Sequence, residues 1–587
     1  MKVHHGRADR SAASARTIGL GAIFLVLLGA VHQTRLGASA TPLCGNGDAD
    51  GSPGECRAVP LRPSDIPPPS VFDSFGANRS VTVPPIDESE DNGESGGTTL
   101  SVLPGSIKQQ GKHLASNETP SSDLVVLPGL LPRPVVAEML ALLRGHEDAD
   151  FAVGKTTIVL DADPDSVDGM TSQEFFLDND SLRSGGSSKG NPNENMEERR
   201  DLRAKLRALT DRYAYDTLVP FLEQWYGKDT CGRPGRRCTP CYSLIRRYRA
   251  GERQSHAPHH DAHSFVTVVV SLTDYGREYN GGLYVSTKNS ERNYVKLNRG
   301  DAVAHQGYLH HGVKVLDQRD DGGPSERWSW IMWFRDSDTC EEHNSEWHRS
   351  CAEKGNPTCM YLRASTEPTE EGVVHWNTMA SKAGHSQASV KLAYANLKML
   401  PSRLIEFNQD EAERLFEEAI ASSNEPDGHY GKAMLYLTDT KKSILEQPTN
   451  EAKAQAAWEA LGSETVKRAI WHLEEAAKGG HVFAMFNLGI ASTYGYGSTD
   501  GTRDFELAIE WFEASGMPEG FFAKSMYLGM IGKTQEAEEF QKRAATLGYG
   551  QPWRKVARER TGSGGSGGVT LNLPWPPLPT GETPPEW

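Results

Sequence analysis

Two short stretches of this 587-residue chain place histidine and carboxylate side chains at a spacing that suits a metal ion. His259 and Asp261 lie two positions apart, and His310 follows farther along the chain. Residues two apart on an extended strand point to the same side, so both can reach one ion, and a neighbouring strand can supply the third ligand. Two imidazoles and one carboxylate with open positions form the donor set typical of non-heme Fe(II) oxygenases.

The surrounding sequence predicts short β-strands that would carry these ligands. The run 265–272 is apolar and β-branched, which favours a buried strand. Asn298-Arg-Gly-Asp301 is a turn signal between two such runs. Further strands are expected at 281–285, 294–297, 302–305, 312–315 and 327–334. Many short strands at close spacing indicate a sandwich or a barrel.

Several motifs occur in the order found in one enzyme family. They are Tyr248-Arg-Ala-Gly251, His259-x-Asp261, Asn280-Gly-Gly-Leu283, Gly300-Asp301, His310-x-Gly-Val-x-Val315 and Arg327-x-Ser329. Together they make the stretch 123–337 resemble the prolyl 4-hydroxylase type of 2-oxoglutarate/Fe(II) dioxygenases. The resemblance implies a double-stranded β-helix (jelly-roll) catalytic domain within a multidomain α+β chain.

The resemblance also implies roles for individual residues. The implied iron ligands are His259, Asp261 and His310. Arg327 would pair with the far carboxylate of 2-oxoglutarate, with Tyr248 and Ser329 as hydrogen-bonding helpers. A guanidinium suits this task because it forks onto a carboxylate through two bonds. O2 would be the second cosubstrate, and ascorbate would be the reductant.

Three features of the pattern depart from the family or stay open. His311 could replace His310 as the ligand, and His310 is preferred because the family has a valine five residues beyond its histidine, which matches Val315. Family members often carry lysine where Arg327 stands. The run 317–326 is interpreted as an inserted surface turn.

The C-terminal third of the chain contains repeated helical patterns. Similar runs occur at 412–419, 469–476, 508–514 and 537–544, and second apolar runs occur at 484–489 and 524–529. Paired helices with a period of about forty residues are typical of an α-solenoid, and the pattern resembles Sel-one-like relatives of tetratricopeptide repeats. Residues 351–362 are interpreted as a degenerate first copy. A repeat domain over 338–550 is expected to bind protein, although such an array can also serve only as a packing partner.

Composition bounds the remaining segments. Basic residues precede an apolar run at 17–31, so residues 1–40 are expected to be a signal peptide or an uncleaved type II membrane anchor. Residues 41–122 and 551–587 are rich in Pro, Gly and Ser, which predicts a disordered stem and a disordered tail. A mobile loop over the substrate is expected at 179–197.

Either form of the N-terminal segment predicts a secretory-pathway location, in the lumen of the endoplasmic reticulum or Golgi. The eight cysteines agree with an oxidising compartment and predict disulfides, although Cys238-Thr-Pro-Cys241 could also be a redox pair or half a zinc site. Asn78, Asn117 and Asn179 are acceptable glycosylation sites. The formal net charge of −16 argues against a nucleic-acid partner.

These observations predict an enzyme that hydroxylates a peptidyl side chain of secretory proteins, with proline as the preferred target, similar to procollagen-proline 4-dioxygenases. Two alternatives stay open. One is a hydroxylase of another side chain, and the other is a non-catalytic lumenal adaptor in protein quality control that uses the helical repeats. Because all the expected ligands precede the repeats, catalysis and partner binding are expected to be separable.

Overall fold

The structure, a computed structural model, describes most of the chain between residues 43 and 550. The described ranges are 43–44, 56–57, 60–66, 69–71, 75–83, 98–105, 124–145, 161–164, 171–177, 196–226, 237–286, 292–336, 346–498 and 501–550. The expected N-terminal targeting segment, the tail 551–587 and nearly all of the loop 179–197 lie outside them. None of the helices in these ranges is both long and apolar enough to span a membrane.

Eight consecutive strands form the centre of two sheets. They are β9 (Thr239–Arg249), β10 (Ser255–His259), β11 (Val266–Ser271), β12 (Gly281–Ser286), β13 (Arg292–Tyr294), β14 (Ala302–Gln306), β15 (His311–Val315) and β16 (Glu326–Arg335). One sheet contains the order β14-β11-β16-β9, and the other contains β10-β15-β12-β13. Every pairing among these eight strands is antiparallel. Strands thus occur at five of the six expected places, whereas the stretch 294–297 is strand only at Tyr294, where β13 ends.

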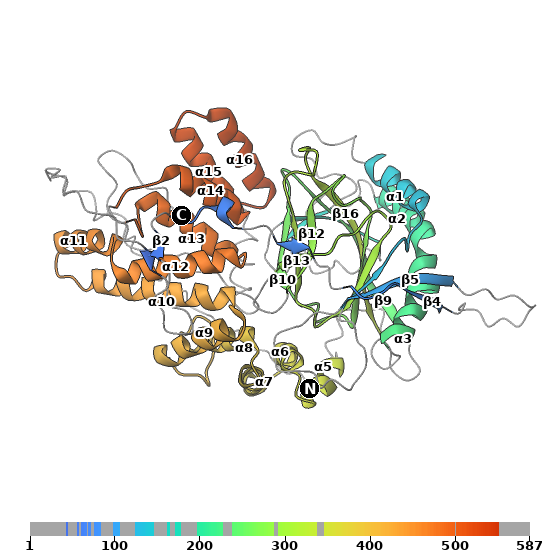
Figure 1. Ribbon diagram of the computed structural model, residues 1–587, viewed down its shortest axis with the longest axis horizontal. Coiled ribbons are helices and arrows are strands. Elements are labelled where there is room, and N and C mark those ends of the chain that lie inside the picture. Colours follow the sequence, from blue (N-terminus) through green and yellow to red (C-terminus); the bar gives the residue numbers. More distant parts are fainter. Residues whose placement is uncertain are drawn as a thin grey trace, which may run out of the picture.

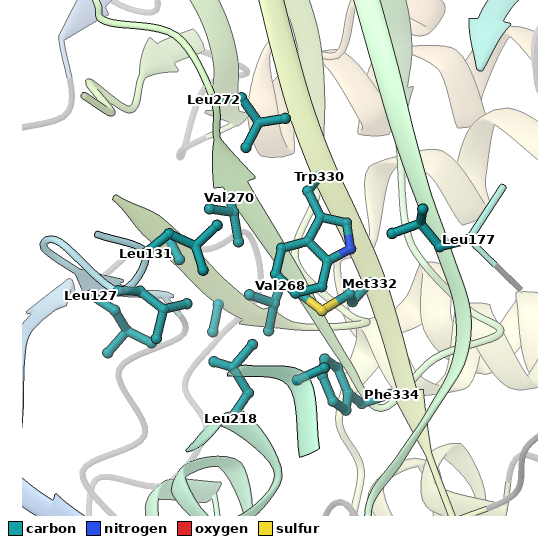
Figure 2. Packing of buried hydrophobic residues seen from close by; sticks show 14 of the residues in the cluster. Leu127, Leu131, Leu177, Leu218, Val268, Val270, Leu272, Trp330, Met332 and Phe334 are labelled. Atoms are coloured by element: carbon teal, nitrogen blue, oxygen red, sulfur yellow. The ribbon is translucent and has the colours of Figure 1, made fainter. Parts of the chain in front are cut away.

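Alternation along β16 divides the side chains between two cores. Trp328, Trp330, Met332 and Phe334 are buried in a cluster with side chains of the flanking helices. These helical segments are α1 (Arg133–Gly145), α2 (Met196–Asp211), a π-helical segment (Arg212–Leu218) and α3 (Val219–Tyr226). Ile331 points the other way, into a cluster shared by both sheets. Figure 2 shows the first cluster, with Trp330, Met332 and Phe334 beside Val268, Val270 and Leu218. The inner face of β16 is thereby left to face the second sheet.

Part of the stretch predicted as a disordered stem is folded. β4 (Arg79–Val83) and β5 (Thr98–Gly105) form a hairpin, which joins the larger sheet through β6 (Leu124–Leu127). β3 (Ser70–Val71) pairs with β13, and Leu61 is buried in the core of the C-terminal helices. The stem prediction is wrong for these segments, because alternating apolar residues bury there despite a composition rich in Pro, Gly and Ser. The sheets are completed by β7 (Asp161–Pro164) and β8 (Thr171–Phe176), and a two-stranded sheet pairs β1 (Leu43–Cys44) with β2 (Cys56–Arg57).

Helices follow the last strand. They are α5 (Glu346–Glu353), α6 (Pro357–Thr366), α7 (Glu370–Lys382), α8 (Ser386–Asn396), α9 (Gln409–Ser423), α10 (Pro426–Leu445), α11 (Asn450–Leu461), α12 (Glu464–Lys478), α13 (Val482–Tyr494), α14 (Phe505–Ser515), α15 (Pro518–Met530) and α16 (Thr534–Thr546). Figure 1 shows them running from α5, beside the sheets, out to α11 and back to α16. The predicted boundary near residue 337 falls between β16 and α5.

The helices approach one another closely at two glycine positions. A Cβ on Gly489 of α13 would come within 2.7 Å of the Phe512 ring on α14. A Cβ on Gly431 of α10 would come within 2.2 Å of the Phe416 ring on α9. Glycine therefore permits close helix contact at these two positions.

Disulfides occur in both parts of the chain. Cys351 and Cys359 are joined, which ties α5 to α6 in the stretch interpreted as a degenerate first repeat. Cys238 and Cys241 are also disulfide-bonded, so neither offers a thiolate to zinc. The prediction of disulfides is confirmed for these cysteines.

Candidate active site

The ends of two neighbouring strands bring the histidines together. β10 and β15 are antiparallel, and the Cα of His259 is directly opposite that of His311. The ladder is irregular between His256 and His259, so the chain leaves β10 on a changed course toward Asp261. Val285 of β12 is the other partner of His311, and it belongs to the core between the sheets. Paired residues share a face, so His311 points into that core.

His259, Asp261 and His311 form a cluster that could hold a metal ion. One potential ligand atom from each lies within 4.8 Å of the others. Nε2 of His259 is 3.4 Å from Oδ1 of Asp261, and Nε2 of His311 is 3.5 Å from Oδ2 of Asp261. Asp261 and His311 are almost fully buried, whereas 22 % of the His259 side chain is exposed. The cluster is therefore reached by solvent at its His259 side.

Hydrogen bonds set the orientation of each candidate ligand. Nδ1 of His259 lies 2.8 Å from the Ala257 carbonyl, and Nδ1 of His311 lies 3.0 Å from the Leu309 carbonyl. A carbonyl only accepts, so each Nδ1 carries the proton and each Nε2 keeps its lone pair for the cluster. Thr267 of β11 donates to Oδ2 of Asp261 at 2.6 Å. These partners leave the donor set in the form that a divalent cation requires.

The electrostatics of the cluster agree with this assignment. Burial alone would raise the pKa of Asp261, but the adjacent His311 and His259 bring it well below its ordinary value. Burial, followed by the neighbouring His305, lowers the pKa of His311 well below its ordinary value. Asp261 is therefore a carboxylate at neutral pH, and His311 is a neutral imidazole.

His310, the third ligand expected from the sequence, lies outside the cluster. Its Nε2 is 3.0 Å from the Gln387 amide nitrogen on α8. Burial lowers the pKa of His310 to about 4, so its ring is neutral too. Successive residues at a strand end point in opposite directions, and His311 rather than His310 shares the inner face. The spacing to Val315 thus favoured the wrong one of two adjacent histidines, and the geometry selects the alternative.

Arg327 lies on the inner face of β16, two residues before Ser329 on the same strand. It is 1 % exposed, and its Nε and Nη2 have no hydrogen-bond partner within the described ranges. A Cβ on Gly282 would lie 3.3 Å from its Nε, so glycine makes room for the guanidinium. Leaving buried donors unpaired is costly, which indicates that an anionic group completes the site.

Arg327 and the metal cluster are both next to β12. Gly282 of that strand lies against the Arg327 guanidinium, and Val285 is the cross-strand partner of His311. The two sites therefore lie along one strand.

The other expected helpers surround Arg327. Tyr248 of β9 is its cross-strand partner, and the guanidinium carbon lies 5.9 Å from the Tyr248 ring centre. The Ser329 hydroxyl is buried without a hydrogen-bond partner in the described part of the chain. Tyr279 was missed from the sequence, yet its ring lies 5.7 Å from the guanidinium. Burial raises the pKa of Tyr279, and the nearby Arg327, which lowers it, does not cancel that effect. Tyr279 therefore stays a neutral phenol.

Two further inward residues lie near the metal cluster. Thr267 and His305 are direct partners on β11 and β14, and both are fully buried. The His305 ring centre is 4.3 Å from that of His311. Period-two alternation in the run 265–272 could have placed Thr267 on the inner face, but sequence gives no sign that it bonds Asp261.

Comparisons with known proteins give only distant likenesses. No protein-family model matches the chain, and no curated protein matches it. Among solved structures, the non-heme alpha ketoglutarate dependent epimerase SnoN from nogalamycin biosynthesis is 18 % identical, with a TM-score of 0.22, over 36 % of this chain and 77 % of that one. A Pseudomonas putida prolyl-4-hydroxylase is 15 % identical, with a TM-score of 0.22, over 36 % and 92 %.

The C-terminal helices have a separate likeness. A Sel1 repeat protein from Oxalobacter formigenes is 16 % identical, with a TM-score of 0.27, over 34 % of this chain and 74 % of that one. Likenesses at these TM-scores do not establish a fold or a function. Any functional assignment therefore rests on the geometry of the described residues.

Proposed function

We propose that this chain is a 2-oxoglutarate- and Fe(II)-dependent oxygenase that hydroxylates a peptidyl side chain. One observation carries the proposal. The Arg327 guanidinium, with two buried and unpaired donors in the described ranges, lies against Gly282 of β12, and His311 of the metal cluster pairs with Val285 of the same strand. A metal site alone would not require a buried cation with unpaired donors. A cosubstrate with a far carboxylate explains both features.

The strand order supports a double-stranded β-helix for residues 239–335. The first, third, sixth and eighth of its strands lie together in one sheet, and the other four lie in the facing sheet. A jelly roll built of eight antiparallel strands has this two-sheet arrangement. Such a fold places the ends of β10 and β15 beside the opening between the sheets.

Each residue of the site has a separate task. His259, Asp261 and His311 would hold the metal, and their backbone and Thr267 hydrogen bonds keep the ligand atoms oriented. Arg327 would bind the far carboxylate of 2-oxoglutarate, with Tyr248, Tyr279 and Ser329 around it. When bound, Fe(II) with 2-oxoglutarate and O2 supplies the oxidising chemistry for placing oxygen on a C–H bond. The apolar walls between the sheets exclude water from that chemistry.

Proline of a secretory protein is the proposed target, with ascorbate as the reductant. The order of motifs along 248–329 supports the target, and the disulfides support an oxidising compartment. We further propose that the helices form an α-solenoid that binds the protein substrate. Hydroxylation of another side chain uses the same site. The non-catalytic adaptor leaves the unpaired donors of Arg327 unexplained.

The test uses purified full-length protein with Fe(II), 2-oxoglutarate, O2 and proline-rich peptides, read by mass spectrometry. A gain of one oxygen on proline, coupled to succinate formation, is expected. Oxygen on another side chain would correct the target and keep the reaction class. No turnover on any peptide, with no uncoupled loss of 2-oxoglutarate, would favour the adaptor.

A further inference from the structure

The residue beside each candidate ligand is in contact with the C-terminal helices. Just before β15 this residue is His310, which precedes His311. The Gln387 amide nitrogen of α8 donates to Nε2 of His310 at 3.0 Å, since an amide nitrogen can only donate. The His310 imidazole thus connects α8 to the start of the strand that carries His311.

His260 also contacts the C-terminal helices. It lies between the candidate ligands His259 and Asp261 in the chain, and its side chain turns away from both. Its Nδ1 lies 3.0 Å from the Tyr308 carbonyl, which fixes the ring. The ring centre lies 6.0 Å from Tyr361 of α6 and 6.4 Å from His385 at the start of α8.

Ala262, which follows Asp261, completes the set. It packs with Tyr308 against a buried cluster formed by α5, α6, α7 and α8. His348 of α5 lies against the backbone of Ala262 and is 1 % exposed. The Cys351–Cys359 disulfide ties α5 to α6 in this cluster. Every candidate ligand therefore has a neighbour that is held by the helices.

We propose that helices α5–α8 position the metal ligands, with Gln387 as the main positioning residue. The proposal rests on the metal site proposed above. Asp261 lies beyond the end of β10, and His259 and His311 are terminal residues of their strands, so ladder hydrogen bonds alone fix them poorly. Packing on their neighbours supplies the missing constraint. Groups that orient metal ligands commonly change metal affinity when they are removed.

Co(II) binding by the full-length protein tests this, because it needs neither turnover nor a known substrate. Gln387→Leu removes the amide and keeps much of the volume. Its matched control is Gln455→Ala, which removes an exposed amide that bonds Glu459 within α11. Titration calorimetry would measure the Co(II) Kd, and absorption spectra would report the ligand geometry.

Gln387→Leu is expected to raise the Co(II) Kd by roughly tenfold, at the lower end of the range for groups that orient ligands. Its Co(II) spectrum should change, while the melting temperature of the metal-free protein stays close to that of the parent. Gln455→Ala should alter none of these. An unchanged Kd and spectrum in Gln387→Leu would overturn the positioning role, as would an equal effect in Gln455→Ala.

His259→Ala separates this inference from the function on which it rests. If the parent chain binds Co(II) no better than His259→Ala, the metal site itself is wrong and both proposals fall. If His259→Ala abolishes binding and Gln387→Leu does not weaken it, the oxygenase proposal stands and only the positioning role is lost.

Discussion

The helices meet the sheets at two junctions that differ in chemistry. The first junction comprises the contacts of Gln387, Tyr361 and His385 with the neighbours of the ligands, and these aromatic and amide side chains are buried or partly buried. The second junction lies at the other end of the helices. There Arg543 of α16 bonds Gln254, just before β10, and lies 3.9 Å from Asp317.

The difference indicates separate roles for the two junctions. Aromatic and amide groups that pack closely keep a fixed geometry, which a metal site requires. An ionic contact with an exposed partner is adaptable and is screened by salt. We therefore expect the first junction to control metal binding and the second to contribute only a small amount to stability.

The largest expected effect separates two adjacent histidines, one inside the metal cluster and one in the first junction. His311→Ala should weaken Co(II) binding by well over 100-fold, because it removes a ligand rather than a group that orients one. His310→Ala should weaken binding about tenfold, because it removes only the connection to Gln387. Titration calorimetry of both variants measures this. A larger loss in His310→Ala would restore the register first expected from the sequence.

A second prediction concerns Arg327, which neither junction touches. Arg327→Ala should raise the Kd for 2-oxoglutarate by roughly 10- to 100-fold, since hydrogen bonds between charged groups are worth about 1.5–3 kcal/mol. Arg327→Lys should be milder because it keeps the charge. Co(II) binding without cosubstrate should survive in both. The control is Arg299→Ala, which breaks a partly exposed pair with Glu278. Equal 2-oxoglutarate affinity in Arg327→Ala would place the anchor elsewhere.

The sequence was sufficient for the parts that depend on local patterns. Apolar, β-branched runs and turn signals predicted most of the strands, and the spacing of His259 and Asp261 predicted a pair that the structure brings into one cluster. Arg327 was expected from the order of motifs, and its role stays a prediction. The choice between His310 and His311 failed, because two adjacent histidines differ only in the strand face they occupy. That face depends on the pairing of β15 with β10 and β12, which is long-range.

The contacts between the two parts of the chain could not be predicted at all. Gln387 is an ordinary helix residue in the sequence, and its role appears only when α8 lies against His310. Catalysis and partner binding were expected to be separable because all the expected ligands precede the repeats, and that expectation stays a prediction. The helices nevertheless contact the neighbours of all three candidate ligands. Ending the chain before α5 would remove those contacts.

The third prediction tests the rigidity of the first junction. Replacing both Cys351 and Cys359 by Ser removes the tie between α5 and α6. A disulfide that closes a loop of this size stabilises by about 2–3 kcal/mol in the chain-entropy model. Urea unfolding should show a loss of that order, and the Co(II) Kd should rise severalfold. Lower stability with an unchanged Kd would mean that the cluster around Tyr361 holds its shape without the disulfide.

The smallest expected effect belongs to the second junction. The Arg543 guanidinium lies 4.1 Å from the ring centre of Phe521, and its partner Asp317 is 64 % exposed. Burial lowers the pKa of Arg543, and the attraction of Asp317 and Glu513 offsets that shift only in part. Arg543→Ala should therefore cost about 0.5–1 kcal/mol, less at high salt. Arg543→Lys should recover part of the loss.

Metal binding is the decisive measurement on Arg543→Ala. Gln254 lies before β10, and the whole strand separates it from His259. Loss of the bond between Arg543 and Gln254 should therefore leave the ligands in place. The Co(II) Kd and spectrum should match those of the parent chain. If Arg543→Ala weakens Co(II) binding as much as Gln387→Leu does, both junctions position the ligands. The helices would then act on the metal site as one rigid body rather than through α5–α8.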